Sequence, residues 1–406
     1  MMKKIVFWAV LCAGVYLLIE LAALTGLFAL KTVRHVSYEP LRRALTAQQK
    51  EEIRRIVEDR DTYAMHDPVL GWRPRPNIEK EGLYRVNSQG IRADKEYSLT
   101  PEAGVLRVGA FGDSFTHADE VKNHETWAHR MSAKNPRVEV LNFGMMAYSL
   151  TQSHLRYKTE GVRYHPHVVF IGFMSEDIRR SVNVFWPYYL PESDFIFAKP
   201  RSAMKGDELV RLDNPLKSLS DYKKLLGVET EAELLTALGA HDYYFQTHYF
   251  EGPLDFLPSV RFYKLFRHAL VNKFSKNKLY KNDVYNTQSE AFLLVTKRME
   301  KFYRLVEQNG SVPVIVLFPN SVDMKQYARN QTRKYDPLLS YLRSQGFRHV
   351  DLMEALEPRF KDQPKEALFM PGGHYTPSGN AVVADHLLDF LGTLDLDLPQ
   401  LTHLHE

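Results

Sequence analysis

Cysteine is almost absent from the sequence, since Cys12 is the only one in 406 residues. A single cysteine excludes a disulfide within the chain and any metal site built from several thiolates, and it leaves reducing and oxidising compartments both open. The net charge is only +4, so the basic excess of a nucleic-acid-binding protein is missing and we expect no nucleic-acid partner. The sixteen histidines show no HExxH or other metal-ligand spacing, so we expect no metal and no cofactor.

Charge is also nearly missing from residues 5–30, which are apolar apart from mild interruptions and Glu20. About 20 apolar residues are enough to cross a bilayer as a helix. A cleaved signal peptide is the alternative, but no clean A-x-A site follows and the run is long for a signal sequence. We therefore expect an uncleaved single-pass anchor over residues 1–31, with residues 5–30 in the lipid bilayer.

The orientation of this anchor is less sharply indicated by charge. Lys3 and Lys4 favour an N-terminus on the cytoplasmic side, whereas Lys31 and Arg34 follow the apolar run. We expect a domain on the periplasmic or extracellular side of the cell membrane. Glu20 would be costly in the bilayer. Either Glu20 faces a partner helix, which would imply a membrane-protein partner, or it merely lies in a tilted segment.

The segments after the anchor change character twice. Residues 32–65 contain a charged helical stretch that Thr46 could cap, and we expect a solvated helical stalk. Turn residues such as Asp67-Pro68 and Gly71 then interrupt residues 66–93. This pattern is typical of short strands and predicts a small β-rich lead-in to a core that continues to residue 178.

Apolar runs alternating with helical patterns predict a parallel sheet between helices. The strands are expected at residues 106–111, 138–144, 167–173, 312–318 and 347–352, and the main helices at 289–309, 336–345 and 381–391. Residues 179–285 interrupt this rhythm with many aromatic residues and are too long for a loop. We expect an inserted, mostly helical cap over 179–285 that shapes a cleft, with the second half of the core at 286–406.

The first core strand ends in Gly112-Asp113-Ser114, and a helical pattern follows. A serine at such a turn lies at the edge of the sheet where open α/β folds bind ligands. The first N–H groups of the following helix point to the same place and could bind an oxyanion. The alternative is an ordinary strand-to-helix turn in which Asp113 or Ser114 only caps the helix.

Three further polar groups follow strand ends: Asn142-Phe143-Gly144, Ser175-Glu176-Asp177 and His374. Acyl transfer by a serine needs a nucleophile, a base and oxyanion donors. Ser114 can be the nucleophile, His374 can return to the sheet edge as the base, and the N–H groups of Ser114 and Gly144 can be donors. His117, three residues after Ser114, fits a cleft-lining or surface histidine better than the base. Asp113 is expected to support the turn.

These motifs resemble the SGNH hydrolases of the GDSL esterase/lipase superfamily, in particular the membrane-tethered bacterial type of the cell envelope. Gly112-Asp113-Ser114-Phe115-Thr116, with Glu120-Val121 after it, is similar to the nucleophile block. The glycine and histidine blocks are matched by Asn142, Gly144, Tyr148, Gln152, His374, Thr376-Pro377 and Gly379-Asn380. The resemblance covers roughly 66–178 and 286–393. It implies a three-layer α/β/α sandwich with a flavodoxin-like parallel sheet.

For function, the resemblance implies a serine esterase, or an acyltransferase with the same chemistry, that acts on an acylated envelope or exported polysaccharide. Two departures concern its chemistry. The family usually has Asn-Asp after the third strand, where this chain has Glu176-Asp177. An ionised Glu176 only accepts hydrogen bonds, although a protonated one could complete the oxyanion site. Asn183 lies nearby but fits the pattern poorly.

The second departure is the acid that usually precedes the histidine, since Pro371 and Gly372 occupy those positions. We therefore expect a Ser114–His374 dyad, with the ring oriented by a backbone carbonyl such as that of Pro371. Both departures keep an alternative open, in which the protein is a catalytically inactive SGNH scaffold that binds a glycan or a membrane partner. Lipid hydrolysis near the membrane is a third possibility and would need an apolar acyl groove.

Overall fold

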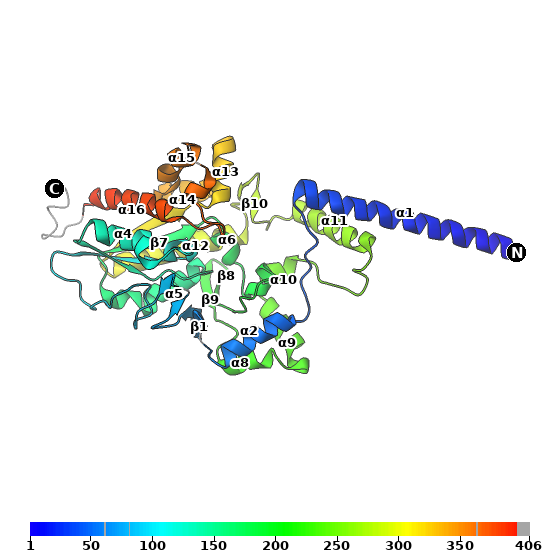
Figure 1. The fold of residues 1–406 in the computed structure, drawn as a ribbon, viewed down its shortest axis with the longest axis horizontal. Coiled ribbons are helices and arrows are strands. Elements are labelled where there is room, and N and C mark those ends of the chain that lie inside the picture. The colour runs from blue at the N-terminus through cyan, green and yellow to red at the C-terminus, as the bar shows by residue number, and fades with distance from the viewer. Residues whose placement is uncertain (61, 81, 363, 396–406) are drawn as a thin grey trace.

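The computed structural model describes residues 1–60, 62–80, 82–362 and 364–395. A long helix, α1 (Met2–Arg34), projects from a body in which helices surround a central sheet (Figure 1). The last residues of the expected second half, 396–406, lie outside the described part of the chain.

The described residues form one sheet of five parallel strands, as the alternating pattern predicted. Across the sheet the order is β13-β12-β7-β5-β6. The strands are β5 (Leu106–Phe111), β6 (Val138–Asn142), β7 (Val168–Met174), β12 (Val312–Phe318) and β13 (His349–Asp351). If the strands are numbered 1 to 5 along the chain and read across the sheet from β6, this is the flavodoxin-like order 2-1-3-4-5. The direction in which successive strands are added to the sheet reverses between β5 and β7. Ligands bind at this reversal, outside the carboxyl ends of the strands, so the ends of β5 and β7 are the place for a site.

Helices cover both faces of the sheet, which gives the expected three layers. Side chains alternate along a strand, so Val108 and Ala110 of β5 face one helical layer and Phe111 faces the other. The first layer contains α4 (Trp127–Lys134), α15 (Met353–Asp362) and α16 (Pro377–Gly392), and the second contains α5 (Leu150–Thr159), α12 (Glu290–Gln308) and α14 (Asp336–Ser344). The remaining helical segments of the core are α3 (Ser114–His117), η1 (Asn123–Glu125), η2 (Gly161–Tyr164), α13 (Ser321–Asn330) and η3 (Lys365–Ala367).

The lead-in consists of two short hairpins that pack on the edge of the core. They are β1 (Ala64–Asp67) with β2 (Gly71–Pro74) and β3 (Glu79–Lys80) with β4 (Tyr84–Arg85). Trp72 is fully buried, and its Nε1–H donates to the Met146 carbonyl at 3.0 Å. The Tyr148 hydroxyl donates in return to the Trp72 carbonyl at 2.7 Å. Trp72 therefore fixes the loop that follows β6.

Replacing Trp72 with Ala should destabilise the protein by about 3–5 kcal/mol, the usual cost of truncating a buried Trp. Trp72→Phe keeps an aromatic ring but leaves the Met146 carbonyl without its donor, which costs about 1–3 kcal/mol. Thermal unfolding of the two variants beside wild type measures both effects. A loss below 1 kcal/mol in Trp72→Ala would show that this contact does not hold the loop.

The insertion between β7 and α12 combines helices with two hairpins. Its elements are α6 (Asp177–Arg180), α7 (Trp186–Tyr189), β8 (Arg201–Lys205), β9 (Glu208–Leu212), α8 (Leu219–Lys224), α9 (Val228–Gly239), α10 (Tyr243–Thr247), α11 (Pro258–Phe274), β10 (Tyr280–Lys281) and β11 (Val284–Tyr285). With the lead-in it shares a hydrophobic core separate from the two cores of the sheet. We call this insertion the cap.

The segment expected to be a solvated stalk is packed against the cap. Thr46 caps α2 (Ala47–Val57) as predicted, through the N–H of Gln49. However, Ile53 of α2 is fully buried and Lys50 forms an ion pair of 2.6 Å with Glu231 of α9. Although α2 is rich in charged residues, one side of it is apolar and packs against the cap, almost two hundred residues away in the chain. The segment therefore does not form a free-standing stalk.

Helix α1 is long and apolar enough to cross a membrane, and its apolar stretch is not buried by the rest of the protein. Its 33 residues span about 50 Å at 1.5 Å per residue. Glu20, which interrupts the apolar run, faces a helix of the same chain, because its carboxylate accepts hydrogen bonds from Ser259 of α11.

Candidate active site

Ser114 is the first residue of α3, directly after β5, so it lies at the carboxyl edge of the sheet where the strand order reverses. The turn is tight. A Cβ on Gly112 would come within 1.9 Å of Thr116 Oγ1, and one on Gly172 of β7 within 2.0 Å of the same atom. Two glycines on neighbouring strands therefore let α3 pack closely onto the sheet edge and fix the position of Ser114.

Asp113 supports this turn, as predicted. Its Oδ1 accepts the N–H of Phe115 at 2.9 Å, which caps α3, and its Oδ2 accepts a hydrogen bond from Arg180 Nη1, also at 2.9 Å. The same Arg180 nitrogen donates to Asp177 Oδ1 and to the Tyr148 carbonyl. Burial and the negative charge of Asp113 raise the pKa of Asp177. Arg180 thus connects the ends of β5 and β7 with the loop after β6, and it places a buried positive charge next to the serine turn.

His374 has an acidic partner, Glu120, which the sequence motifs did not identify as one. Glu120 Oε2 is 2.7 Å from His374 Nδ1 and also accepts the backbone N–H of His374 at 3.1 Å. Glu120 Oε1 accepts the N–H of Gly372 at 2.8 Å. The expected orientation of the ring by a carbonyl such as that of Pro371 is therefore wrong, because the carboxylate of Glu120 bonds Nδ1.

The backbone around Glu120 explains how it reaches His374. Ala118 and Glu120 have φ values of 63° and 69°, and these left-handed residues turn the chain back after the short helix α3. The Tyr84 hydroxyl accepts a hydrogen bond from the Glu120 N–H at 2.8 Å and so helps to fix the backbone at this position. Opposite, a Cβ on Gly372 would come within 2.4 Å of the Glu120 carboxylate. The absence of a side chain at Gly372, one of the two departures from the family, is what makes room for Glu120.

The imidazole of His374 also contacts the nucleophile segment. Its ring centroid lies 5.1 Å from that of Phe115, the residue after Ser114. With Nδ1 bonded to Glu120, Nε2 is the nitrogen that can exchange a proton with a serine. No hydrogen bond joins Ser114 Oγ to His374 in the described structure, and such catalytic hydrogen bonds often tighten only when substrate binds. The described residues contain no group of three His, Cys, Asp or Glu that could hold a metal ion.

Backbone N–H groups at the serine turn and in the loop after β6, where the Met145 N–H donates to the Gly112 carbonyl, are candidates for binding an oxyanion. In the part of the chain that the structure describes, neither the N–H of Ser114 nor that of Ala147 has a hydrogen-bond partner. The N–H of Gly144, the expected second donor, is engaged by Asn142 Oδ1 at 2.9 Å. Ala147 adopts a φ of 62° and directly precedes Tyr148, whose carbonyl binds Arg180. Ala147 is thus the better candidate, and only its unusual backbone geometry reveals it.

Glu176 turns toward the cap. Its Oε2 accepts a hydrogen bond from the Tyr189 hydroxyl at 2.8 Å. Burial raises the pKa of Glu176, but the positive charge of Arg179 and the Tyr189 hydrogen bond outweigh it, so the pKa lies below its ordinary value. An ionised carboxylate has no proton to donate, so Glu176 lacks the donor that a role in the oxyanion site requires. Asn183 is also elsewhere, since its side chain binds Asp242 and the Phe185 carbonyl.

His117, which we expected in the cleft or on the surface, is fully buried. Its Nδ1 bonds Asp119 and its Nε2 bonds the Tyr63 hydroxyl, so both ring nitrogens are engaged away from Ser114. Burial, reinforced by the positive charge of Arg92, lowers the pKa of His117 to about 4. His117 is a neutral packing residue of the lead-in interface, and this excludes it as the catalytic base.

This buried histidine should make the protein less stable in mild acid. Below about pH 6.5 the unfolded state binds a proton at His117, whereas the folded state binds it only near pH 4. Stability contributed by the neutral ring is therefore complete above pH 6.5 and lost as the pH falls to 4, by about 3 kcal/mol. Thermal unfolding between pH 7 and pH 4 should show a shallower acid loss in His117→Gln than in wild type, while the exposed His165→Gln should match wild type. An equal loss of stability with falling pH in wild type and in both variants would contradict this role of His117.

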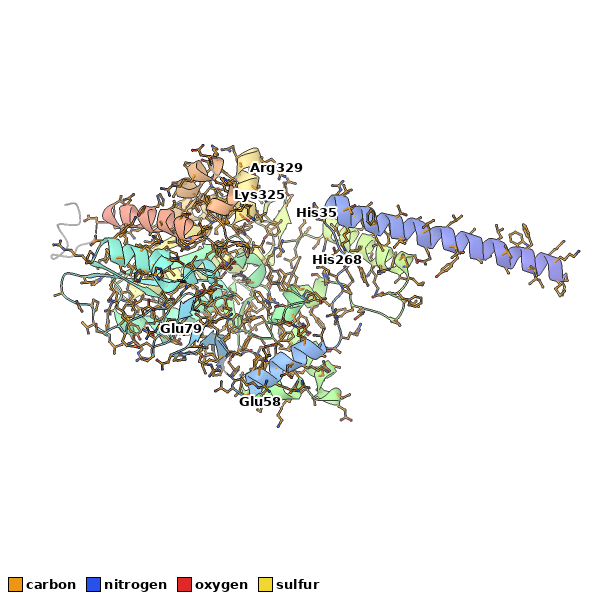
Figure 2. All side chains as sticks on the ribbon, viewed as in Figure 1. His35, Glu58, Glu79, His268, Lys325 and Arg329 are labelled. Atoms are coloured by element: carbon orange, nitrogen blue, oxygen red, sulfur yellow. The ribbon has the colours of Figure 1, made fainter. Side chains whose placement is uncertain are left out.

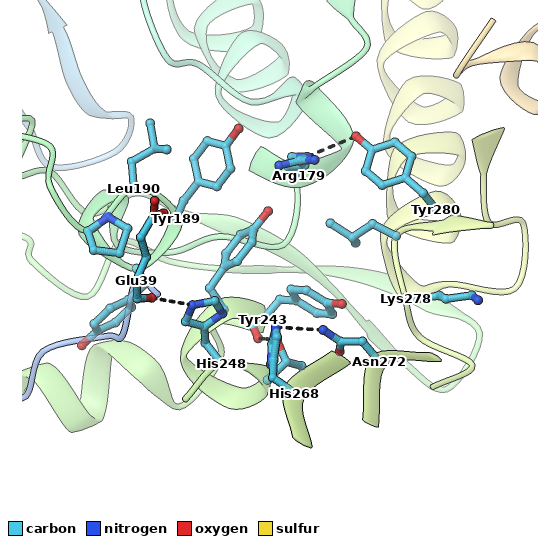
Figure 3. Close-up of a pocket in the computed structure, with 15 residues that line it drawn as sticks. Glu39, Arg179, Tyr189, Leu190, Tyr243, His248, His268, Asn272, Lys278 and Tyr280 are labelled. Carbon is cyan, nitrogen blue, oxygen red and sulfur yellow. Dashed lines mark hydrogen bonds between the residues drawn. The ribbon is translucent and has the colours of Figure 1, made fainter. Parts of the chain in front are cut away.

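A pocket of about 580 Å³ lies in the cap, and its lining includes none of Ser114, Glu120 and His374 (Figure 3). One lining residue, Tyr189, donates to Glu176, which follows β7. Arg179 Nε donates to the Tyr280 hydroxyl at 3.2 Å across its upper rim. The lining combines aromatic rings with polar groups, among them Tyr188, Tyr189, Tyr243, Tyr244, Tyr280, Arg179, His248, His268 and Asn272. A pocket of this size and composition suits a small organic ligand.

No family model matches the chain, and no curated protein matches it. Solved structures are similar to it. A member of the lipolytic G-D-S-L family from Veillonella parvula is 12% identical, with 71% of this chain and 99% of that chain covered and a TM-score of 0.36. A catalytic mutant of an acetylxylan esterase from Geobacillus stearothermophilus is 13% identical, with 71% and 95% covered and a TM-score of 0.34.

An α/β hydrolase from the metagenome of Lake Arreo, Spain, is also similar, at 13% identity, with 72% of this chain and 98% of that chain covered and a TM-score of 0.38. The chain is thus similar to G-D-S-L proteins and esterases, at identities and TM-scores too low for any of their activities to be carried over to it.

Proposed function

We propose that the protein is a serine esterase in which Ser114, His374 and Glu120 act together. The observation that carries this proposal is the carboxylate of Glu120 on His374 Nδ1 at 2.7 Å. A nucleophile, a base and a group that orients the base are the minimum for acyl-enzyme chemistry. Glu120 supplies the third of these from an unexpected position in the chain, which favours an active enzyme over an inactive scaffold.

In the proposed reaction, Ser114 Oγ attacks the ester carbonyl while His374 Nε2 takes its proton. Glu120 holds the ring with Nε2 toward the serine and stabilises the imidazolium that forms. The free N–H groups of Ser114 and Ala147 receive the oxyanion, where each lost donor typically costs about 10²–10³ in turnover. His374 then protonates the leaving alcohol. Water, or a sugar hydroxyl in an acyl transfer, releases the acyl group from Ser114.

For the substrate we propose an acylated carbohydrate of the cell envelope or an exported polysaccharide. The pocket supports this class because its tyrosines present both flat apolar faces and hydroxyl groups, which suit the apolar and polar faces of a sugar. Helix α1 supports a location at the membrane, with the domain on the periplasmic or extracellular side.

The test is covalent labelling of the full-length protein in nanodiscs with a fluorophosphonate, followed by peptide mapping. An adduct on Ser114, with Ser175 unlabelled, supports the proposal. Ser175 is a useful internal comparison because it follows the neighbouring strand, but its hydroxyl is bonded to Asp323. No adduct on Ser114, while a soluble serine esterase reacts under the same conditions, would contradict it.

One observation favours the second candidate, a non-catalytic scaffold that binds a glycan or a membrane partner: Glu176 is ionised where an oxyanion donor is usual. The variant Glu176→Asn separates the two proposals. If only this variant hydrolyses an aryl acetate, the site has lost its activity by substitution and the scaffold is favoured. If wild type hydrolyses it, Glu176 is compatible with catalysis.

A further inference from the structure

Helix α11 of the cap lies beside the domain-proximal half of α1 (Figure 1). Glu20 of α1 accepts the Ser259 N–H at 3.0 Å and the Ser259 hydroxyl at 2.5 Å. Farther along, a Cβ on Gly26 of α1 would come within 2.8 Å of the Phe262 ring of α11. The contacts advance in the same direction along both helices, so α11 starts at the level of Glu20 and runs with α1 back toward the body.

The pair of helices is fastened to the rest of the cap on the inner side of α11. Lys264 forms an ion pair with Asp255, and Asp255 also accepts the Tyr38 hydroxyl from the chain that leaves α1. The rings of His268 and His248 lie 4.8 Å apart at the same junction, where Figure 2 shows His268 close below His35 at the end of α1. The position of α11 against α1 is therefore set by polar contacts on both sides.

The opposite side of α11 is apolar and exposed. Tyr263, Phe266, Leu270 and Phe274 recur every three or four residues, so they form one stripe along the helix. The loop before α11 continues it with Leu254 and with Phe256, which is 72% exposed. No other described segment covers this stripe, and Phe266 and Phe274 are 59% and 74% exposed. We call Leu254, Phe256 and these four residues the α11 stripe.

We propose that residues 252–266, the loop and first half of α11, are embedded in the outer leaflet of the membrane beside α1. The hydrocarbon core is about 30 Å thick, or roughly 20 helical residues, while the apolar run of α1 covers residues 5–30. Glu20 and Gly26 then lie in the outer part of that layer, and the start of α11 lies at the same depth. Continuity with the exposed apolar surface of α1 thus identifies lipid as the occupant of the α11 stripe.

Two features fit this depth. A carboxylate inside a bilayer is costly unless it is paired, and the Ser259 N–H and hydroxyl supply Glu20 with donors at its own level. The first half of α11 also carries basic residues, Arg261 and Lys264, and Lys264 is paired with Asp255. Arg267 and Lys273 follow in the second half, nearer the body. Cations at the headgroups gain about 1 kcal/mol each from anionic lipids.

The test uses the full chain with Cys12 replaced by Ser, in nanodiscs of phosphatidylcholine and phosphatidylglycerol. Single cysteines replace Phe256, Phe266, Leu17 of α1 and Val322, and each carries an environment-sensitive nitrobenzoxadiazole label. Lipids with a nitroxide at carbon 5 or carbon 12 quench labels at shallow or deep positions. Val322 is a matched control, because it is an apolar residue, 53% exposed, on α13 of the body.

We expect labels at Phe256 and Phe266 to be quenched at least twofold, Phe256 the more strongly by the deep nitroxide, while Val322 is unchanged. Water-like emission at both positions with Leu17 quenched would overturn the proposal, as would shielding that nitroxide lipids do not quench, which would indicate a protein partner. An unquenched Leu17 would overturn it too, and would show that α1 itself is not in the bilayer. None of these outcomes depends on esterase activity.

A second pair of variants tests the packing of α11 on α1. Leucine at Gly26 would displace Phe262, whereas Gly14 of the same helix has nothing within 4 Å of its Cβ position. Gly26→Leu should change the quenching of both α11 labels, and Gly14→Leu should leave it as in the parent. Identical profiles in the two variants would contradict a helix pair at membrane depth.

Discussion

Replacing Ser114 with Ala should lower the turnover of an aryl acetate by roughly 10⁴–10⁶-fold, the range seen when a serine nucleophile is removed. This corresponds to about 5–8 kcal/mol of lost transition-state stabilisation. The loss should fall on kcat with little change in KM, because removing one hydroxyl group should leave ground-state binding of the substrate almost unchanged. Fluorophosphonate labelling should disappear in the same variant.

Stability should be almost unaffected by Ser114→Ala. Ser114 Oγ has no hydrogen-bond partner among the described residues, so its removal leaves no unsatisfied group. Ser132→Ala is the matched control, since Ser132 Oγ of α4 accepts the Val140 N–H of β6. That variant should lose some stability and keep its activity. Equal activities of Ser114→Ala and wild type would exclude Ser114 as the nucleophile.

Replacing Glu120 with Gln should lower kcat by roughly 10²–10⁴-fold. A carboxamide keeps the size of the side chain but offers one acceptor oxygen to three N–H groups, those of Gly372 and His374 and the ring Nδ1. If the amide nitrogen faces Nδ1, the ring takes the other tautomer and Nε2 can no longer accept the serine proton, which costs up to about 10⁴ in related triads. Steady-state kinetics of the purified variant measure this.

Two comparisons separate an effect on catalysis from one on folding. Glu125→Gln, five residues later, changes a carboxylate that caps η1 through the Lys122 N–H, and it should keep near-normal turnover. Glu120→Asp retains the charge and should recover part of the rate despite its shorter reach. If Glu120→Gln turned over like wild type, the contact with His374 would be structural only and the proposed triad would be wrong.

The strands and the positions of Ser114 and His374 at the sheet edge could be predicted because their signals are local. Each core strand is a short apolar run, and β5 and β12 begin and end where that pattern predicted. Ser114 stands where such a run meets a turn. His374 stands before a helix whose start, Thr376-Pro377, is a common capping sequence. Parallel strands bring their carboxyl ends to one edge, so the meeting of these segments followed from the alternation of strands and helices.

The other residues of the proposed site could not be predicted from such local signals. Glu120 and His374 are 254 positions apart, and no periodicity relates them; the left-handed backbone at Ala118 and Glu120 directs the carboxylate. Ala147 likewise occupies a backbone conformation that favours glycine or asparagine, so its residue type gives no sign of the role proposed for its N–H. Helix α2 was interpreted from its charges alone, and its apolar partner lies in the distant cap.

The bond between Glu120 and His374 also sets the order in which the site can come into existence. Synthesis proceeds from the N-terminus at about 5–20 residues per second, so the serine turn leaves the ribosome long before the segment with the base. Until Gly372 and His374 dock on Glu120, the nascent chain carries a nucleophile with no base beside it. In the proposed mechanism, the closing of the last turn before α16 is therefore the step that completes the triad, and a chain ending before His374 should show no activity toward esters.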